Sequence, residues 1–185
     1  MRKIMFGSIA AAMLVWAGPG LENAAIAAGE ETTNMTTPAP HTAKDHEVLL
    51  ASDDPALAAN KRLVYDMYRI LLQAGHTGRA HEFIAKDYIQ HNPNADQGLQ
   101  GIIDYVKKTR PERPIEDKVE LPLINLVAER DMVMIAFVRP EKDAQGTTYY
   151  STWFDLFRIE DGRIAEHWDP MLKSDQPIDP NDKRL

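Results

Sequence analysis

The sequence predicts an α+β fold in which helices come first and an antiparallel sheet follows. Two observations support this. Between Ser52 and Gly75 apolar residues recur at the spacing of one helical face, and after residue 118 the chain changes to short segments rich in β-branched and aromatic residues. Because helices and strands are segregated along the chain, we expect the helices to pack on one face of the sheet.

Three helices are expected. The first spans 52–75, where Ser52 or Asp53 can cap the helix, Pro55 suits its first turn and Gly75 ends it. Shorter helices are expected over 79–86 and 102–108. The residues between them, 87–101 (DYIQHNPNADQGLQG), are predicted to form a polar loop.

Four strands are expected after the helices. They correspond to the segments KVELPLINLVAERD, MVMIAFVRPE, TTYYSTWFDLFRIED and GRIAEHWDP, which turn-forming residues separate. Since the connections are short, consecutive strands should pair antiparallel as a meander.

The composition limits the possible functions. A chain of 185 residues is long enough for one domain with a core and short for two. Its net charge of −7 is a poor match to nucleic acid, whose phosphates require a basic surface. The absence of cysteine excludes disulfides, thiol nucleophiles and cysteine-based zinc sites.

The first 27 residues have the order of a signal peptide. Arg2 and Lys3 precede an uncharged run over 4–16, and small residues follow up to Ala27. The run is shorter than the roughly 20 residues of a membrane span, although a retained anchor helix is the alternative. We expect cleavage after Ala27 and a periplasmic or secreted protein that no longer contacts the membrane.

The rest of the chain divides by composition into three parts. Residues 28–51 are rich in Gly, Glu, Thr and Pro and are predicted to be a flexible linker. Residues 52–170 form the folded domain. Residues 171–185 have little to bury and read as a tail, either loose or crossing to a partner subunit.

The last hairpin can close in two ways. A two-residue Asp161-Gly162 loop would place His167 opposite Leu156 and turn Asp155 away from His167. A three-residue loop that includes Glu160 would pair Asp155 with His167. Since acid with base and aromatic with aromatic are stabilising cross-strand pairs, we expect the three-residue loop.

This register separates the hairpin side chains into two faces. Both faces carry apolar residues, so both are expected to be covered and the polar groups to be partly enclosed. The first face holds Trp153, Asp155, Phe157, Ala165, His167 and Asp169, and the second Phe154, Leu156, Ile164 and Trp168. A carboxylate beside an imidazole in apolar surroundings can exchange a proton near neutral pH. The alternative is a structural hydrogen bond that fixes the strand register.

Two segments resemble a known family. Residues 88–106 (YIQHNPNADQGLQGIIDYV) and 155–169 (DLFRIEDGRIAEHWD) resemble the SnoaL-like branch of the nuclear transport factor 2-like superfamily, which includes polyketide cyclases. The resemblance covers about 52–170. It implies a cone-shaped, strongly curved antiparallel sheet with three N-terminal helices, and a pocket inside the cone.

The resemblance also implies roles for individual residues. In SnoaL-type cyclases an Asp removes a proton for an aldol ring closure without metal or cofactor, which implies Asp155 as base and His167 as its partner. Asp169 occupies a place comparable to an Asp of limonene epoxide hydrolases, but the matching Arg and second Asp of that hydrolase are not evident here. His91 and Asn92 would lie at the pocket mouth, although Asn-Pro also starts turns.

The remaining aromatic residues are assigned to core or pocket wall rather than to chemistry. This applies to Tyr88 and Trp153, and equally to Tyr65 and Tyr68 of the first helix. Four side chains could hold a divalent metal, namely His91, His167, Asp155 and Asp169, but no short His-x-His spacing supports this and no metal is expected.

Two hypotheses follow for function. The first is a cofactor-free enzyme that removes a proton next to a carbonyl, with cyclisation or isomerisation of a small apolar carbonyl compound as the outcome. The second is a non-catalytic protein that binds such a compound in the same pocket. In either case the resemblance implies a homodimer formed through the outer sheet face.

Overall fold

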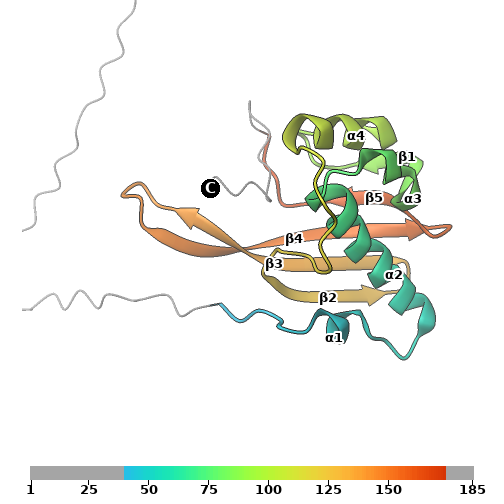
Figure 1. Cartoon of the computed structure of the whole chain (residues 1–185), viewed down its shortest axis with the longest axis horizontal. Helices are drawn as coiled ribbons and strands as arrows, with labels where there is room; N and C mark the ends of the chain where they lie inside the picture. Colours follow the sequence, from blue (N-terminus) through green and yellow to red (C-terminus); the bar gives the residue numbers. More distant parts are fainter. Residues whose placement is uncertain (1–39, 174–185) are drawn as a thin grey trace, which may run out of the picture. The chain divides into compact units, whose positions relative to one another are not determined.

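The structure, a computed structural model, describes residues 40–173. Five strands form one sheet in the order β1-β5-β4-β3-β2, and the helices lie against one of its faces (Figure 1). The elements in chain order are α1 (His46–Leu50), α2 (Pro55–Asp66), the π-helix η1 (Met67–Gln73), the 3-10 helix η2 (Thr77–Arg79), α3 (Ala80–Phe83), β1 (Ile84–Gln90), α4 (Gly98–Thr109), β2 (Leu123–Glu129), β3 (Met132–Lys142), β4 (Thr148–Glu160) and β5 (Arg163–Trp168). The predicted α+β class and the four-stranded antiparallel meander are confirmed.

One strand was missing from the sequence prediction. The helix expected over 79–86 ends at Phe83, and Ile84–Gln90 forms β1, which pairs parallel with β5 at the edge of the sheet. The register between these strands shifts between Ile84 and Ile89. Because of this shift, the buried residues of β1 do not alternate strictly, and the usual pattern of a strand is absent from the sequence.

The folded part also begins earlier than predicted. Residues 46–50, assigned to a linker, form α1, where Leu50 is buried in the core. His46 Nδ1 lies 2.8 Å from the Tyr65 hydroxyl, and burial lowers the pKa of His46. The linker assignment is therefore wrong for this stretch. The expected signal peptide, the first part of the linker and nearly all of the tail lie outside the described residues.

The first long helix changes its geometry where it enters the core. α2 continues directly into the π-helix η1, whose buried residues include Met67, Tyr68 and Leu71. π-helical turns are uncommon and are found frequently at functional sites. Here the wider turn directs Met67, Tyr68 and Leu72 towards one cavity beneath the helices.

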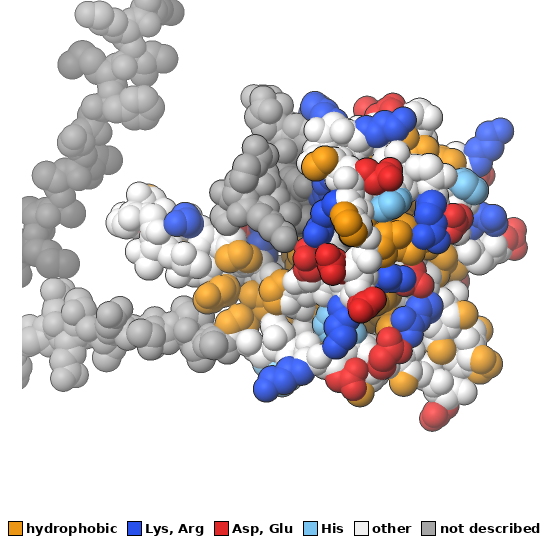
Figure 2. Space-filling view, in the orientation of Figure 1, with side chains coloured by type: hydrophobic (Ala, Val, Ile, Leu, Met, Phe, Trp, Pro, Cys, Tyr) orange, Lys and Arg blue, Asp and Glu red, His pale blue; other side chains and the backbone are white. Residues whose placement is uncertain are grey.

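β3 and β4 are longer than their neighbours. β2 pairs with β3 only as far as Phe137, and β5 pairs with β4 only as far as Leu156, so the far parts of β3 and β4 form a two-stranded ribbon that projects from the sheet (Figure 1). Hydrophobic side chains are exposed where this ribbon leaves the body (Figure 2). Among residues 40–173, no helix has the length and apolar character needed to cross a membrane.

Candidate active site

The turn of the last hairpin is the two-residue one, so the predicted three-residue loop is wrong. Glu160 pairs with Arg163 and Ile159 with Ile164, and both Asp161 and Gly162 have positive φ angles of 49° and 70°. Positive φ at both central residues is the geometry of a type I′ turn, which suits the twist of a hairpin. Continued without interruption, this register would turn Asp155 away from His167.

A β-bulge at Ala165 brings the side chains of His167 and Asp155 back to the same face of the sheet. Beyond it Arg158 pairs with Glu166 and Phe157 with His167, so Ala165 is an extra residue on β5. The extra residue shifts the pairing by one position and returns His167 to the face that holds Asp155. Ile164 lies before the bulge, pairs with Ile159 and is buried in the core, so its predicted place on the face opposite Asp155 is wrong.

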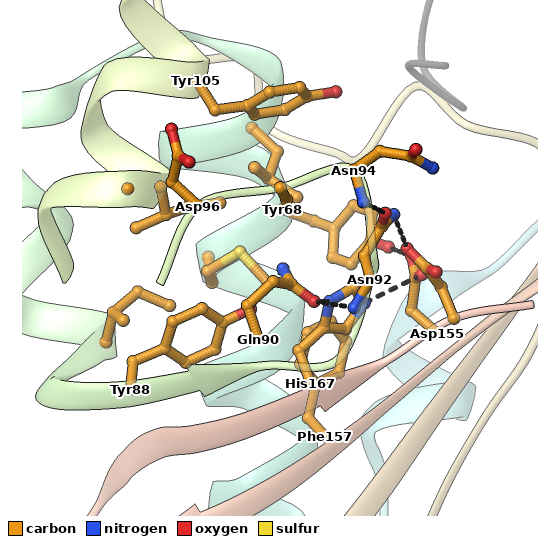
Figure 3. Close-up of a pocket in the computed structure, with 17 residues that line it drawn as sticks. Tyr68, Tyr88, Gln90, Asn92, Asn94, Asp96, Tyr105, Asp155, Phe157 and His167 are labelled. Atoms are coloured by element: carbon orange, nitrogen blue, oxygen red, sulfur yellow. Dashed lines mark hydrogen bonds and ion pairs between the residues drawn. The ribbon is translucent and has the colours of Figure 1, made fainter. Parts of the chain in front are cut away.

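The inner face of the hairpin forms one wall of a cavity of about 80 Å³. This is room for several water molecules or a small organic group. Polar side chains gather on one side of it, while Tyr88, Tyr105 and apolar side chains of α4 and η1 lie on the other (Figure 3). α4 packs closely against the backbone of Asp96 because Gly101 has no side chain. A Cβ added at Gly101 would lie 2.5 Å from the Asp96 carbonyl oxygen.

Asp155 is the most buried charged group at the cavity, with 4% of its surface exposed. The Trp153 indole donates to its Oδ1 (2.9 Å), the Tyr68 hydroxyl donates to its Oδ2, and His167 Nε2 lies 3.0 Å from Oδ1. Burial raises the pKa of Asp155, while the contact with His167 lowers it. The pKa of this carboxyl is thus closer to neutral pH than the pKa of an exposed Asp.

His167 is fixed from both sides of its ring. Nδ1 lies 2.9 Å from Gln90 Oε1, and the ring stacks on Phe157 with centroids 4.8 Å apart. Asp155 on β4 and His167 on β5 therefore form a contact pair between adjacent strands (Figure 3). Gln90 of β1 and Phe157 of β4 hold the imidazole in place.

Asp169 and Asn92 form a second polar pair at the cavity. The Asn92 amide donates to Asp169 Oδ2 (2.6 Å), and the Met171 backbone N–H donates to Asp169 Oδ1 (3.2 Å). Asn92 Oδ1 accepts from the Asn94 backbone (2.8 Å), which shapes the loop after β1. Both residues line the cavity, as does Tyr88.

Two predicted site residues lie elsewhere. The His91 side chain is outside the cavity lining; it stacks on Trp168 (4.6 Å between centroids) and lies 3.0 Å from Glu166. Trp153 is buried behind Asp155 and contacts that carboxylate rather than the cavity. Since successive residues of a strand point to opposite faces, the neighbours His91 and Asn92 could not both face the cavity from extended backbone.

Two further polar residues at the cavity were not identified from the sequence. Tyr68 was assigned to core or pocket wall without a role and Gln90 to a loop, yet Tyr68 binds Asp155 and Gln90 binds His167. Partners 87 and 77 residues apart have no local spacing that would indicate them. The only available signal was the alternation of Tyr88, Gln90 and Asn92 along a strand that was predicted as a loop.

Three side chains have the geometry of possible metal ligands. Asp155, His167 and Asp169 place one ligand atom each within 4.8 Å of one another. Both oxygens of Asp155, however, already accept from N–H or O–H donors or contact His167, and a cation would have to displace these groups. The donor set therefore fits a shared proton better than a metal ion.

Several solved structures are similar to this chain at low identity. TsrD from Streptomyces laurentii is 22% identical, over 64% of this chain and 90% of TsrD, with a TM-score of 0.44. A protein of Acidithiobacillus ferrooxidans classed with polyketide cyclases is 17% identical, over 64% of this chain and 89% of that one, with a TM-score of 0.45. An epoxide hydrolase of the LEH-like kind from M. tuberculosis is 14% identical, over 62% and 84%, with a TM-score of 0.46.

The sequence itself matches one family model. No curated protein sequence matches the chain. The model of the SnoaL-like domain matches residues 64–167, a segment that includes η1, Asp155 and His167. This match covers more than half of the chain, and the chain therefore belongs to the SnoaL-like domain family.

Proposed function

We propose that the protein is a cofactor-free acid–base catalyst that removes and returns a proton next to the carbonyl group of a small, largely apolar compound. The observation that carries the proposal is the buried Asp155 carboxyl at the cavity wall, 3.0 Å from His167. Burial raises the pKa of Asp155, which makes its carboxylate a stronger base than an exposed Asp.

The proposed reaction moves one proton out and back. The Asp155 carboxylate takes a proton from the carbon next to the carbonyl, and the electron pair of the broken C–H bond moves to give an enolate. The enolate carbon then bonds to a second carbonyl carbon of the same molecule, whose oxygen becomes an alkoxide. That alkoxide takes the proton from Asp155, so the enzyme returns to its first state and no other reactant is consumed.

The charges of the cavity favour an uncharged substrate. Among the described residues that line it, none is Lys or Arg, while Asp96, Asp155 and Asp169 are acidic. A carboxylate or phosphate group on the substrate would meet like charges with no cation to balance it. The aromatic and aliphatic side of the cavity suits an apolar body attached to the carbonyl group.

The proposal is tested by proton exchange, which requires no knowledge of the natural substrate. A panel of small ketones and diketones is incubated with the protein in D₂O, and loss of the hydrogen next to the carbonyl is followed by NMR. We expect Asp155→Asn to slow this exchange about 10²- to 10⁴-fold, since an amide cannot take the proton.

A matched variant controls for the loss of a carboxylate. Asp87 lies on β1 and is exposed, so Asp87→Asn should leave the exchange rate unchanged. Circular dichroism should give the same spectrum for both variants. Exchange at the wild-type rate in Asp155→Asn would contradict the assignment of the base.

The second candidate function is binding without catalysis. The observation that favours it is that both oxygens of Asp155 already have partners, as in a structural hydrogen-bond network. A thermal shift screen with the same panel separates the two, because a binding protein would be stabilised by a ligand. Stabilisation by a ketone whose hydrogens are never exchanged would favour this function.

We further propose export and self-association. The N-terminal sequence order supports export to the periplasm or beyond, and sequencing the N-terminus of the protein from its natural host tests whether it begins at Ala28. Association of two copies is supported by the outer face of the sheet, which exposes Val127 and Phe154.

A further inference from the structure

Gln90 at the end of β1 makes three side-chain contacts. Its side chain is buried, with 7% of the residue exposed. Oε1 lies 2.9 Å from the backbone nitrogen of Asn92 and 2.9 Å from His167 Nδ1, and Nε2 lies 3.0 Å from the Tyr88 hydroxyl. The amide thus links the wall of the cavity to the imidazole (Figure 3).

The neighbours of Gln90 decide which amide atom faces His167. The Asn92 backbone N–H can only donate a hydrogen bond, so the atom facing it must be the amide oxygen. The same oxygen faces His167 Nδ1 and can only accept. His167 Nδ1 must therefore carry a hydrogen.

This conclusion determines the contact between His167 and Asp155. A neutral imidazole with a hydrogen on Nδ1 has a lone pair on Nε2, the atom 3.0 Å from Asp155 Oδ1. Two lone pairs facing each other at this distance repel, so one proton must lie between them, on the carboxyl or on the ring. The pair then holds one proton in either form.

We propose that Gln90 is a positioning residue that fixes the tautomer of His167, so that Nδ1 stays protonated and only the Nε2 proton is exchanged with Asp155. This assignment rests on the proposed function for its catalytic meaning. Gln90 acts through His167 and needs no contact with the substrate.

The surroundings hold Gln90 and His167 in this arrangement. The side chain of Gln97 binds both the backbone N–H (2.9 Å) and the backbone C=O (2.6 Å) of Gln90, which fixes the end of β1. Phe157 stacks on the His167 ring and limits its rotation. The other titratable groups at the ring are Asp155 on β4 and Asp169 after β5.

The test is the ¹⁵N NMR spectrum of the His167 ring, which distinguishes protonated from bare nitrogens. We expect a protonated Nδ1 in the wild type at every pH at which the protein is folded. Gln90→Glu keeps the acceptor and should keep Nδ1 protonated, whereas Gln90→Leu removes it and should give a mixture of tautomers. Tyr88→Phe is the matched control, because it removes only the far partner of the amide.

Proton exchange of the ketone panel gives a second readout. We expect Gln90→Leu to slow exchange about 10- to 100-fold, the range found when a metal-bound histidine loses the partner that orients it, and Gln90→Glu to restore most of it. If Gln90→Leu does not fold, the wild-type and Gln90→Glu spectra still show whether His167 Nδ1 is protonated. A bare Nδ1 with a protonated Nε2 in the neutral ring of the wild type would overturn the proposal.

The two proposals fail in different ways. The NMR result needs no substrate, so the tautomer can be as expected even if Asp155→Asn retains full exchange activity. That outcome would contradict the proposed function and leave a structural role for Gln90. Conversely, loss of exchange in Asp155→Asn together with a bare Nδ1 would overturn only the role of Gln90.

Discussion

At the scale of residues, the site depends on how Asp155 is stabilised inside the protein. A buried carboxylate is costly unless donors surround it, and here an indole N–H, a phenol O–H and an imidazole do so. The first two donors cannot lose a proton near neutral pH, so His167 is the partner able to share one. The phenol of Tyr68 therefore stabilises the charged form of Asp155 and is not expected to take part in the proton transfer itself.

Removing this phenol should move the titration of Asp155. Tyr68→Phe takes away a hydrogen bond that favours the charged carboxylate, so the pKa of Asp155 should rise above its wild-type value. The chemical shift of the Asp155 carboxyl carbon, followed by ¹³C NMR against pH, measures this directly. The basic form of the residue should then appear at higher pH than in the wild type. An unchanged or lower midpoint would show that Tyr68 does not stabilise the carboxylate.

The sequence allowed part of this residue set to be predicted. Asp155, His167 and Asp169 lie close enough along one hairpin for strand periodicity to place them on one face, and the structure brings them together. Tyr68 and Gln90 come from distant elements, and only the packing of η1 and β1 against the sheet brings them there. Such long-range contacts have no signature in local sequence.

At the scale of elements, the bulge in β5 decides which side chain faces the cavity. The sequence predicted the correct face for His167 with the wrong loop, because a three-residue loop and a two-residue loop followed by a bulge shift the register with the same parity. Turn residues indicate the loop type, but Ala165 has no feature that marks an extra residue. The face on which His167 lies could therefore be predicted, but the two-residue turn and the bulge that place it there could not.

Changes at the bulge test this explanation. Deleting Ala165 removes the unpaired residue and keeps His167 opposite Phe157, so we expect the contact between His167 and Asp155 to persist. Inserting one alanine after Ala165 should reverse the orientation of 166–168 and break that contact. The ring signals of His167 in NMR report both results. Equal spectra for the two variants would contradict the role given to the bulge.

The other two elements missed from the sequence were β1 and α1. β1 combines a register shift with a partly exposed edge position, and α1 is only five residues long. Both depend on contacts with segments far along the chain; for example, Lys61 Nζ binds the Leu49 carbonyl (3.0 Å). Local periodicity predicts long amphipathic helices and regular strands well, and short docked elements poorly.

At the scale of the whole molecule, the sheet has one face covered by helices and one outer face that is partly apolar. On the outer face Phe154 is 45% exposed and Val127 is 41% exposed. The half-buried Met134 pairs with Val127 on β2 and with Leu156 on β4, the next residue after Phe154 on the same face of β4. A contiguous apolar patch of this kind on a folded domain is typical of an interaction surface. A second copy could cover it by a two-fold arrangement.

This surface can be tested by charge substitution. We expect Phe154→Lys to convert a dimer into a monomer, since a buried unpaired lysine would disfavour association, as measured by sedimentation equilibrium. Val48→Lys is the control, because Val48 is exposed but belongs to α1 and not to a strand of the sheet. A wild type that sediments as a monomer at every concentration would contradict self-association.

The central claim is that Asp155 and His167 form an acid–base pair that acts on a bound carbonyl compound. The most direct measurement is a crystal structure with a bound diketone that the protein exchanges or a slowly reacting analogue. We expect an Asp155 oxygen about 3 to 3.5 Å from the carbon next to the carbonyl, the distance of a reactive arrangement. A ligand bound in the cavity with Asp155 in contact only with Tyr68, Trp153 and His167 would contradict the claim.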